Sequence, residues 1–406
     1  MKEKYNNLLK KIDEKKEYLK KLLCDFIKID TTNPPGDEYK LASFVINIFK
    51  QNNIRYDVFE KEKGRTNVVG YIGETGPKIM IASHMDVVPA GDGWHTSPFE
   101  PYEKENKIYG RGAGDNKGPL AASMVIAEIL KEIEQELKCQ VIIAAVADEE
   151  QGSTFGMEYL LKEKLINPDF AIIPDIGGNL TEIDIAEKGV LHIDVISHGK
   201  QVHGSKPDLG INAIVLMSEL ITCLQQHNFK YTPHDTLNNP TINFGIISGG
   251  SAINTVPSIC KLGIDIRYLP SQTPEDILNE IKTIADKVIE KHSNIKGEKG
   301  KFEFNLRSDL KPSDVDPENI LVKITREIAP LITGKEVKLI GMGGATVAKQ
   351  LNLNGITAIG FSPGNGEVFH SPNEYIDINE LIDFVKIMCL IILNDSMRIE
   401  LNLDSR

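Results

Sequence analysis

Long apolar runs are missing from this sequence of 406 residues. No stretch reaches the roughly 18 consecutive apolar residues that a membrane-spanning helix needs. Residues 1–30 carry charge throughout and lack the apolar core of a signal peptide. Basic residues are in deficit, because 46 Lys and Arg stand against 58 Asp and Glu and give a net charge of −12. A nucleic-acid partner needs a basic surface, so we expect neither a membrane nor a nucleic acid as a partner.

Paired cysteines are absent as well. The cysteines show no CxxC spacing and their number is odd, which indicates reduced thiols rather than a disulfide framework. They are Cys24, Cys139, Cys223, Cys260 and Cys389. We therefore expect a cytoplasmic protein with reduced, mostly buried thiols. A cysteine could still act as a nucleophile, but nothing in the sequence singles one out.

The N-terminal segment has an amphipathic pattern. Between residues 8 and 27, leucine, isoleucine and phenylalanine recur at helical spacing. The polar face of this predicted helix carries acids as well as lysines, whereas a helix on a membrane surface favours basic residues. We expect it to pack on the body of the protein.

The first half of the chain alternates strand and helix patterns. Residues 78–83, 141–147 and 170–175 are nearly all apolar, as strands buried on both faces should be. Helical patterns at 118–134 and 154–165 separate them. This alternation predicts an α/β fold with a mostly parallel sheet, in which ligands bind at the carboxyl ends of the strands.

The pattern changes from about residue 188. The predicted elements follow the order strand, helix, strand, strand, helix, strand, which is the ferredoxin-like arrangement. They lie at 189–199, 210–226, 242–250, 258–270, 273–292 and 301–307. Helix and strand patterns then resume. A chain of this length exceeds one compact core. We therefore predict one domain of residues 1–187 and 309–406, with a smaller domain of residues 188–308 inserted into it.

Five short segments place an acid or a histidine beside an apolar strand or a glycine-rich turn. Together they supply two histidines and several carboxylates, which suits two divalent metals with one carboxylate left over as a base. The segments are His84-Met85-Asp86, Asp115 in GRGAGDNKG, Glu149-Glu150 in ADEEQGS, Asp175 in AIIPD, and His370 in EVFHSPNEYI.

Each segment allows a different reading when it is taken alone. His84 and Asp86, two residues apart at a strand end, could be a solvated pair, or a ligand whose tautomer the acid fixes. Asp115 lies among glycines that let the backbone wrap closely around an ion. A dinucleotide-binding loop is the alternative, but the GxGxxG spacing is not met and an acid would face the phosphates.

The remaining segments also gain their meaning from the set. Glu149 and Glu150 could be a surface charge pair. Because side chains of neighbouring residues diverge, one can instead bind metal while the other takes a proton from a metal-bound water. Asp175 and His370 alone are more often structural, but as members of the set both are expected to be ligands.

The motifs SHMDVVPAGDGW, GRGAGDNKG, DEEQGS and FHSPNEYI resemble those of the zinc amidohydrolase family. This family includes acetylornithine deacetylase, succinyl-diaminopimelate desuccinylase, aminoacylase and related carboxypeptidases and dipeptidases. The resemblance runs from about Tyr18 to the C-terminal helix. It implies that His84, Asp115 and Asp175 hold one metal, and that Asp115 bridges to a second held by Glu150 and His370. It further implies Glu149 as the general base and Asp86 as the partner of His84.

The resemblance also implies roles for the inserted domain. This domain would be a dimerisation lid, and the protein a homodimer. His203, in VHGSKPDLGINAI, would reach the partner subunit's active site and stabilise the oxyanion. A loop histidine on the surface is the alternative. Asn254 and Arg267 would bind the substrate's carboxylate. Gly343 and Gly344 would belong to a substrate-binding loop late in the sequence, called the late loop below.

Two positions bear on the substrate. The family often shows Gly-Gly-Thr-Asp-Ala in the late loop, whereas residues 343–348 read GGATVA and lack the aspartate. Residue 175 is Asp, where the deacylases mostly carry Glu and several di- and tripeptidases carry Asp. The expected activity is hydrolysis of the amide bond of an N-acyl amino acid or short peptide with a free carboxylate, with two Zn ions, or Co or Mn. Rival hypotheses are a nucleotide-dependent oxidoreductase and a catalytically silent metal-binding homologue.

Overall fold

The computed structural model describes residues 5–394, and the chain forms two compact units. Within the described residues, unit 1 contains the chain up to Ile185, the segment Val315–Ile340 and the chain from Ala345 onward. Unit 2 contains Ala186–Asp314 together with Gly341–Gly344. No helix in the described part of the chain is both long and apolar enough to cross a membrane. All five cysteines are free, and three of them are buried.

The main sheet of unit 1 is mixed. Its strands follow the order β1 (Arg55–Glu60), β2 (Thr66–Ile72), β6 (Gln140–Val146), β3 (Lys78–His84), β7 (Phe170–Ile173), β15 (Thr357–Gly360) and β8 (Glu182–Glu187). The four strands β6, β3, β7 and β15 run parallel, as expected. Antiparallel partners extend them at both ends, and the strand patterns alone did not predict this. The end of β8 pairs with β13 (Ser313–Asp314), and β14 (Lys338–Met342) also pairs with β8.

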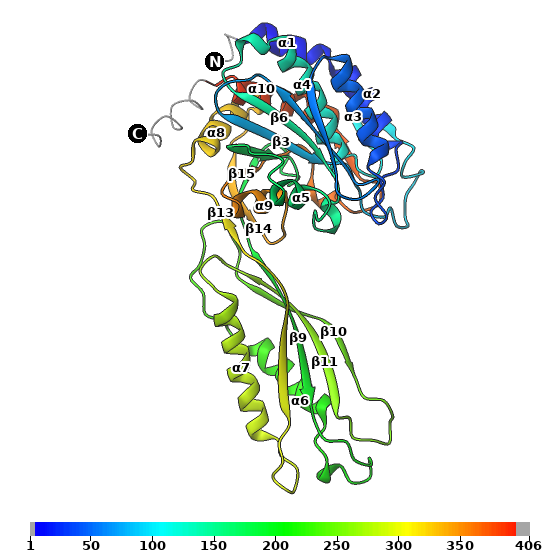
Figure 1. Cartoon of the computed structure of the whole chain (residues 1–406), viewed down its shortest axis with the longest axis vertical. Helices are drawn as coiled ribbons and strands as arrows, with labels where there is room; N and C mark the ends of the chain where they lie inside the picture. The colour runs from blue at the N-terminus through cyan, green and yellow to red at the C-terminus, as the bar shows by residue number, and fades with distance from the viewer. Residues whose placement is uncertain (1–4, 395–406) are drawn as a thin grey trace. The chain divides into compact units, whose positions relative to one another are not determined.

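Helices cover both faces of this sheet (Figure 1). Along β3, Ile79 and Ile81 face one apolar cluster, whereas Met80 and Ala82 face the other. The first cluster is completed by α1 (Asn6–Glu14), α2 (Lys16–Ile27), α3 (Tyr39–Gln51), α4 (Lys117–Glu132), α8 (Ile320–Thr333) and α10 (Ile378–Ile392). The second is completed by α5 (Met157–Lys162) and α9 (Val347–Leu353). Burial on both faces explains why these strands read as continuous apolar runs.

The N-terminal segment packs as expected but forms two helices. A turn at Lys15 separates α1 from α2, so the amphipathic pattern is not one continuous helix. Leu9 and Ile12 of α1 and Leu19 and Leu23 of α2 are buried in the first apolar cluster. Burial of this apolar stripe against the sheet-covering helices stabilises both of them.

A small antiparallel sheet lies next to the glycine-rich loop. Its strands are β4 (Tyr102–Lys104), β5 (Lys107–Tyr109) and β16 (Tyr375–Asp377), in the order β16-β5-β4. Tyr109 stacks on Tyr102 with ring centroids 4.8 Å apart and also contacts Tyr375. Because β5 precedes the loop that carries Asp115 and β16 follows the loop that carries His370, their pairing brings these loops together.

Unit 2 has the predicted ferredoxin-like topology. Its chain order is β9 (Gly189–His198), α6 (Ala213–Gln226), β10 (Thr241–Gly249), β11 (Ile259–Tyr268), α7 (Pro274–Lys291) and β12 (Lys301–Leu310). The sheet order is β10-β11-β9-β12, with every pair antiparallel. The helices cover one face of this sheet, where alternate residues such as Leu191 and Ile193 are buried. Asn212 and Thr273 cap the two helices by accepting hydrogen bonds from backbone N–H groups.

Candidate metal centre

Three neighbouring parallel strands end at the same edge of the sheet. His84 is the last residue of β3, and β6 beside it ends two residues before Asp148. Glu149 and Glu150 then open a short 3-10 helix, η2 (Glu149–Gln151). Asp175 follows β7, on the other side of β3. Strand direction therefore accounts for the proximity of these side chains, as expected for ligands at the carboxyl ends of a parallel sheet.

Asp115 reaches this edge from the loop before α4. The buried carboxylate of Glu374 accepts hydrogen bonds from the backbone N–H groups of Gly112 (3.2 Å), Gly114 (2.8 Å) and Asp115 (3.0 Å). Its charge is balanced by Arg111, whose Nη1 lies 2.7 Å from Oε2. The adjacent Asp115–Asn116 peptide bond is cis. Glu374 thus fixes the backbone that aims Asp115 at the site.

The same arginine reaches the second loop. Arg111 Nη2 donates to the backbone oxygen of His370 at 3.3 Å, and its guanidinium lies over the ring of Trp94. One buried ion pair, Arg111–Glu374, therefore contacts both loops that supply the last two members of the set. Neither residue was singled out from the sequence, although both lie inside the motifs GRGAGDNKG and FHSPNEYI.

The donor atoms form two groups that share Asp115. His84, Asp115 and Asp175 place one donor atom each within 4.8 Å of one another, and so do Asp115, Glu150 and His370. His84 Nε2 lies 2.8 Å from Asp115 Oδ1, whereas His370 Nε2 lies 3.0 Å from Asp115 Oδ2. The two oxygens of one carboxylate thus face different groups, which is the arrangement of a bridging ligand between two metal ions.

Burial and repulsion govern the charges at this edge. Burial, followed by the nearby charge of Asp115, raises the pKa of Asp175 to about 7. Burial and the charge of Asp175 raise the pKa of Glu149 well above its ordinary value. Hydrogen bonds with Asp115 and Glu150 raise the pKa of His370 to about 10. The carboxylates of Asp175 and Asp115 likewise raise the pKa of His84 well above its ordinary value, against the effect of burial. The acids therefore outnumber the histidines that face them.

This donor set fits a pair of divalent cations. Glu150 Oε1 is buried and has no hydrogen-bond partner, which is costly for a carboxylate oxygen unless a cation binds it. Its other oxygen, Oε2, lies 3.2 Å from His370 Nε2. Imidazole nitrogens with carboxylate oxygens are ligands that zinc accepts. A cation in each group would neutralise the excess negative charge and satisfy this oxygen.

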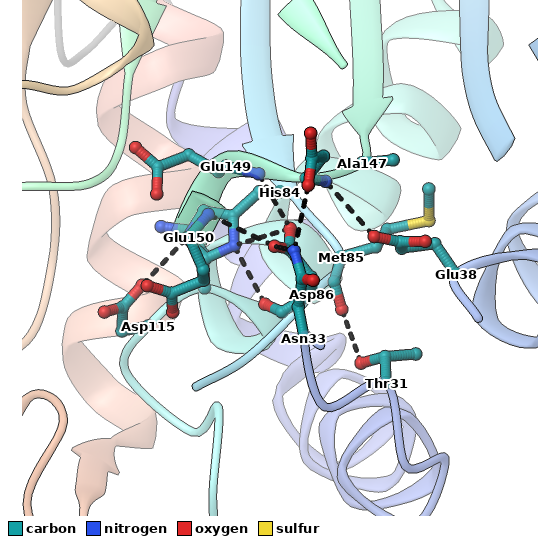
Figure 2. Close-up of polar contacts among 12 residues, drawn as sticks. Thr31, Asn33, Glu38, His84, Met85, Asp86, Asp115, Ala147, Glu149 and Glu150 are labelled. Atoms are coloured by element: carbon teal, nitrogen blue, oxygen red, sulfur yellow. Dashed lines mark hydrogen bonds and ion pairs between the residues drawn. The ribbon is translucent and has the colours of Figure 1, made fainter. Parts of the chain in front are cut away.

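Asp86 connects the end of β3 to the turn that carries the two glutamates (Figure 2). Its Oδ1 and Oδ2 accept hydrogen bonds from the backbone N–H groups of Glu149 and Glu150, both at 3.1 Å. His84 Nδ1 lies 2.9 Å from the backbone oxygen of Asp86 and 3.5 Å from Oδ1. In Figure 2 the side chains of Glu149 and Glu150 leave the turn in different directions, Glu150 towards Asp115. The sequence suggested the contact of Asp86 with His84 but not its contact with the turn.

The other predicted site residues all lie in unit 2. His203 and Asn254 are brought together there, because the backbone segments around them pair and Gly204 N donates to Asn254 O at 2.7 Å. Arg267 lies beside the late loop, with Nη1 3.3 Å from the backbone oxygen of Gly343. Its fork is occupied by Asp265, which accepts from Nε at 2.9 Å and from Nη2 at 3.1 Å.

Comparison with known protein families assigns the chain to one of them. The sequence model of Peptidase family M20/M25/M40 matches residues 80–394 of this chain. The chain belongs to this family. It is accordingly a metallohydrolase that acts on amide bonds, and the family resemblance of the sequence motifs is confirmed. A nucleotide-dependent oxidoreductase finds no support.

Relatives in this family span almost the whole chain. An uncharacterized metallohydrolase of Methanocaldococcus jannaschii is 31% identical, over 92% of this chain and 91% of that protein. A probable succinyl-diaminopimelate desuccinylase of Staphylococcus aureus is 26% identical, over 90% of this chain and 94% of that protein. The crystal structure of the aminopeptidase PepT from Bacillus cereus has the same fold, with a TM-score of 0.74, 21% identity and coverage of 93% and 98% of the two chains.

The shared position of Asp115 predicts unequal effects of removing single ligands. The wild-type chain, dialysed against Zn²⁺ and analysed by elemental analysis, should hold two ions, one for each donor group. Asp115→Ala should lose both, because Asp115 belongs to both groups. His370→Ala should keep the ion held by His84 and Asp175. His95→Ala, which removes an exposed histidine of the same unit, is the control and should keep both. Equal metal loss in Asp115→Ala and His370→Ala would contradict the shared ligand.

Proposed function

We propose that this protein hydrolyses the amide bond of a short peptide or an N-acyl amino acid that has a free carboxylate. The observation that carries the proposal is the pair of donor groups joined by Asp115, with Glu149 beside them. His84, Asp115 and Asp175 would hold one cation, and Asp115, Glu150 and His370 the other, with Zn²⁺ as the expected ion and Co²⁺ or Mn²⁺ as alternatives. Two such cations supply Lewis-acid polarisation of a carbonyl and activation of water.

Glu149 is proposed as the general base. It directly precedes Glu150 but belongs to neither donor group. A carboxylate in this position can accept a proton from the attacking water and then pass it to the nitrogen of the leaving amine. Asp86 supports this role, because it holds the backbone N–H of Glu149 and so fixes where the side chain starts.

Unit 2 would recognise the substrate. We propose that Arg267 and Asn254 bind its carboxylate, that Gly343 and Gly344 line the path of its backbone, and that His203 of one subunit stabilises the oxyanion in the partner's site. Residues 1–187 and 309–406 would then be the catalytic domain, and residues 188–308 the dimerisation lid of a homodimer. Since Asp265 occupies the fork of Arg267, the substrate's carboxylate would have to share this arginine. The five free thiols support a reducing compartment such as the cytoplasm.

Short peptides are favoured over N-acyl amino acids. Two relatives point in different directions, because one is named a desuccinylase and the other an aminopeptidase. Residue 175 is Asp, and residues 343–348 lack the aspartate that the deacylases often carry. The first feature leans towards a short peptide, and the second speaks against the specificity of the named deacylases.

A substrate panel tests this preference. The Zn²⁺- and Co²⁺-loaded proteins should hydrolyse dipeptides and tripeptides with a higher kcat/KM than N-acetyl or N-succinyl amino acids, and a chelator should abolish both activities. Release of the free amino group is the measurement. A clear preference for N-succinyl amino acids would reverse the assignment, and hydrolysis that survives complete removal of metal would overturn the proposed function.

Substitution of Glu149 separates the base from the ligands. Glu149→Gln should lower kcat by about 10²–10⁴-fold, the usual contribution of general acid–base catalysis, while the metal content stays at the wild-type level. Glu163→Gln, at an exposed position after α5, serves as the control and should leave both unchanged. Loss of metal in Glu149→Gln as complete as in His84→Ala would exchange the roles of Glu149 and Glu150.

His203 tests whether two subunits build each site. His203→Ala should lower kcat by roughly 10²–10³-fold, as expected for the loss of one oxyanion donor, with metal binding unaffected. Mixing His203→Ala chains with Glu149→Gln chains should restore activity, because one of the two sites in the mixed dimer receives both intact residues. His198→Ala, a histidine on β9 of the same unit, is the control. If native mass spectrometry shows that subunits exchange but no activity returns, the shared site is wrong.

A further inference from the structure

A second buried ion-pair network lies behind the turn that carries Glu149 and Glu150. We propose that Arg65 is a positioning residue that fixes this turn through Asp148. The inference rests on the proposed function in one respect, because it takes Glu149 and Glu150 to be the working carboxylates. It concerns residues that belong to neither donor group and to which the sequence analysis gave no role, although Asp148 lies inside the motif DEEQGS.

Asp148 has a backbone conformation that few side chains adopt. Its φ of 64° and ψ of 24° place it in the left-handed region, although it is not glycine, and it is only 2% exposed. A residue is held there only where its surroundings compensate for the strain. Because Asp148 joins the end of β6 to η2, its conformation decides the direction in which the next two residues leave the strand.

The carboxylate and the N–H of Asp148 are anchored on several sides. Oδ1 accepts hydrogen bonds from Arg65 Nη2 (2.9 Å) and Asn33 Nδ2 (3.1 Å), and Oδ2 accepts one from the backbone N–H of Phe155 (3.0 Å). The backbone N–H of Asp148 donates to Glu38 Oε1 at 3.2 Å. Three consecutive acids thus separate, with Asp148 facing the interior and Glu150 facing the donor groups.

Arg65 is the cation of this network. Its Nε and Nη2 form a fork on Glu38, at 2.8 and 2.7 Å, and Nη2 also reaches Asp148. Arg65 is 7% exposed and Glu38 is fully buried. A Cβ atom at residue 36 would overlap the Arg65 side chain, so Gly36 leaves the space that the guanidinium fills. The planar fork of arginine suits two carboxylates, whereas the single ammonium of lysine does not reproduce it.

Asn33 links this network to Asp86. Its Nδ2 lies 2.8 Å from Asp86 Oδ2 as well as 3.1 Å from Asp148 Oδ1. Asp86 in turn holds the backbone N–H groups of Glu149 and Glu150. Figure 2 shows Asn33 beside Asp86, with Glu38 on the other side of the chain segment after Ala147. The turn is therefore held from one side by Asp86 and from the other by Arg65 through Asp148.

Loss of Arg65 would leave Glu38 and Asp148 as buried carboxylates without the cation that joins them. Removing one partner of a buried pair leaves an uncompensated charge, so the remaining acids separate. Asp148 then loses the one cation among the contacts that hold its left-handed conformation. Glu150, as a proposed ligand, and Glu149, as the proposed base, would both shift, so metal affinity and kcat should fall together.

The experiment measures zinc affinity and turnover in the full-length chain. Arg65→Met should bind Zn²⁺ about 10–100-fold more weakly in competition with a chromophoric chelator, the range for residues that position metal ligands. Its kcat should fall more than its KM rises, and Arg65→Lys should recover only part of the loss. Asp148→Gly reaches the left-handed region without strain, yet should also bind zinc weakly, because the side-chain anchor is gone.

Two controls separate positioning from general stability. Glu128→Gln disturbs another buried carboxylate of unit 1, which accepts hydrogen bonds from Tyr18 and Lys15. It should lower the melting temperature but leave zinc affinity and kcat unchanged. The double variant Arg65→Met/Asp148→Asn should bind zinc no more weakly than Arg65→Met alone, because residues that act through one another do not add.

Each outcome decides a different question. Wild-type zinc affinity and kcat in Arg65→Met, with a lower melting temperature, would overturn the inference and leave Arg65 as a stabilising residue. If Arg65→Met does not fold, Arg65→Lys and Asp148→Gly give the same decision, and wild-type behaviour of Asp148→Gly would show that backbone conformation alone suffices. A wild-type chain that binds none of Zn²⁺, Co²⁺ and Mn²⁺ would overturn the proposed function itself, whereas zinc binding that is equal in all variants overturns only the role of Arg65.

Discussion

Excess negative charge at one edge of a parallel sheet is the constraint on which this structure depends. Asp115, Glu149, Glu150 and Asp175 converge where β3, β6 and β7 end, and His84 and His370 are the histidines that face them. Such a cluster is unfavourable unless protons or cations enter it. Burial, followed by repulsion between these acids, raises the pKa values of Asp175 and Glu149, and one buried oxygen of Glu150 has no hydrogen-bond partner. Family membership and the geometry of the donors are two independent reasons to expect metal ions here.

Other buried carboxylates hold the backbone of the loops that carry these acids. Glu374 accepts hydrogen bonds from three backbone N–H groups around Asp115, and Asp86 accepts hydrogen bonds from two in the Glu149–Glu150 turn. Hydrogen bonds from N–H groups to a carboxylate are strong and directional, so each buried acid fixes a loop. Arg111 and Arg65 balance part of the charge behind the site. Two sets of acids are thus distinct: Glu374 and Asp86 orient the backbone, whereas Asp115, Glu150 and Asp175 supply donor atoms.

The sequence predicted the centre of the fold and the members of the donor set for a physical reason. Continuous apolar runs indicate strands buried on both faces, and polar residues directly after such runs must gather at the carboxyl edge. His84, Glu150 and Asp175 could be found in this way, and alternation predicted the sheet of unit 2. The antiparallel direction of the edge strands could not be found, because an apolar run shows that a strand is buried but not which way it pairs. The small sheet of β4, β5 and β16 was missed because strands of three residues lack a distinct pattern.

The ion pairs that support the site could not be predicted from local sequence patterns either. Arg65 and Asp148 are 83 positions apart, and Arg111 and Glu374 are 263 apart. A single sequence gives no signal that such residues meet, since each alone looks like an ordinary charged residue of a loop. For the same reason the contact of Asp86 with the backbone of Glu149 and Glu150 was missed, although its neighbour His84 was recognised.

The pairing of β5 with β16 has a consequence for how the protein matures. Residues 107–109 can pair in the small sheet only when residues 375–377 are present. The loop around Asp115 likewise needs Glu374, which accepts its backbone hydrogen bonds. During synthesis the N-terminal part emerges from the ribosome first. Its acids at the sheet edge are then present without His370 and without the clamp on Asp115. The donor set can be assembled only when almost the whole chain is available, so an unfinished chain cannot present the complete centre to metal ions or substrates.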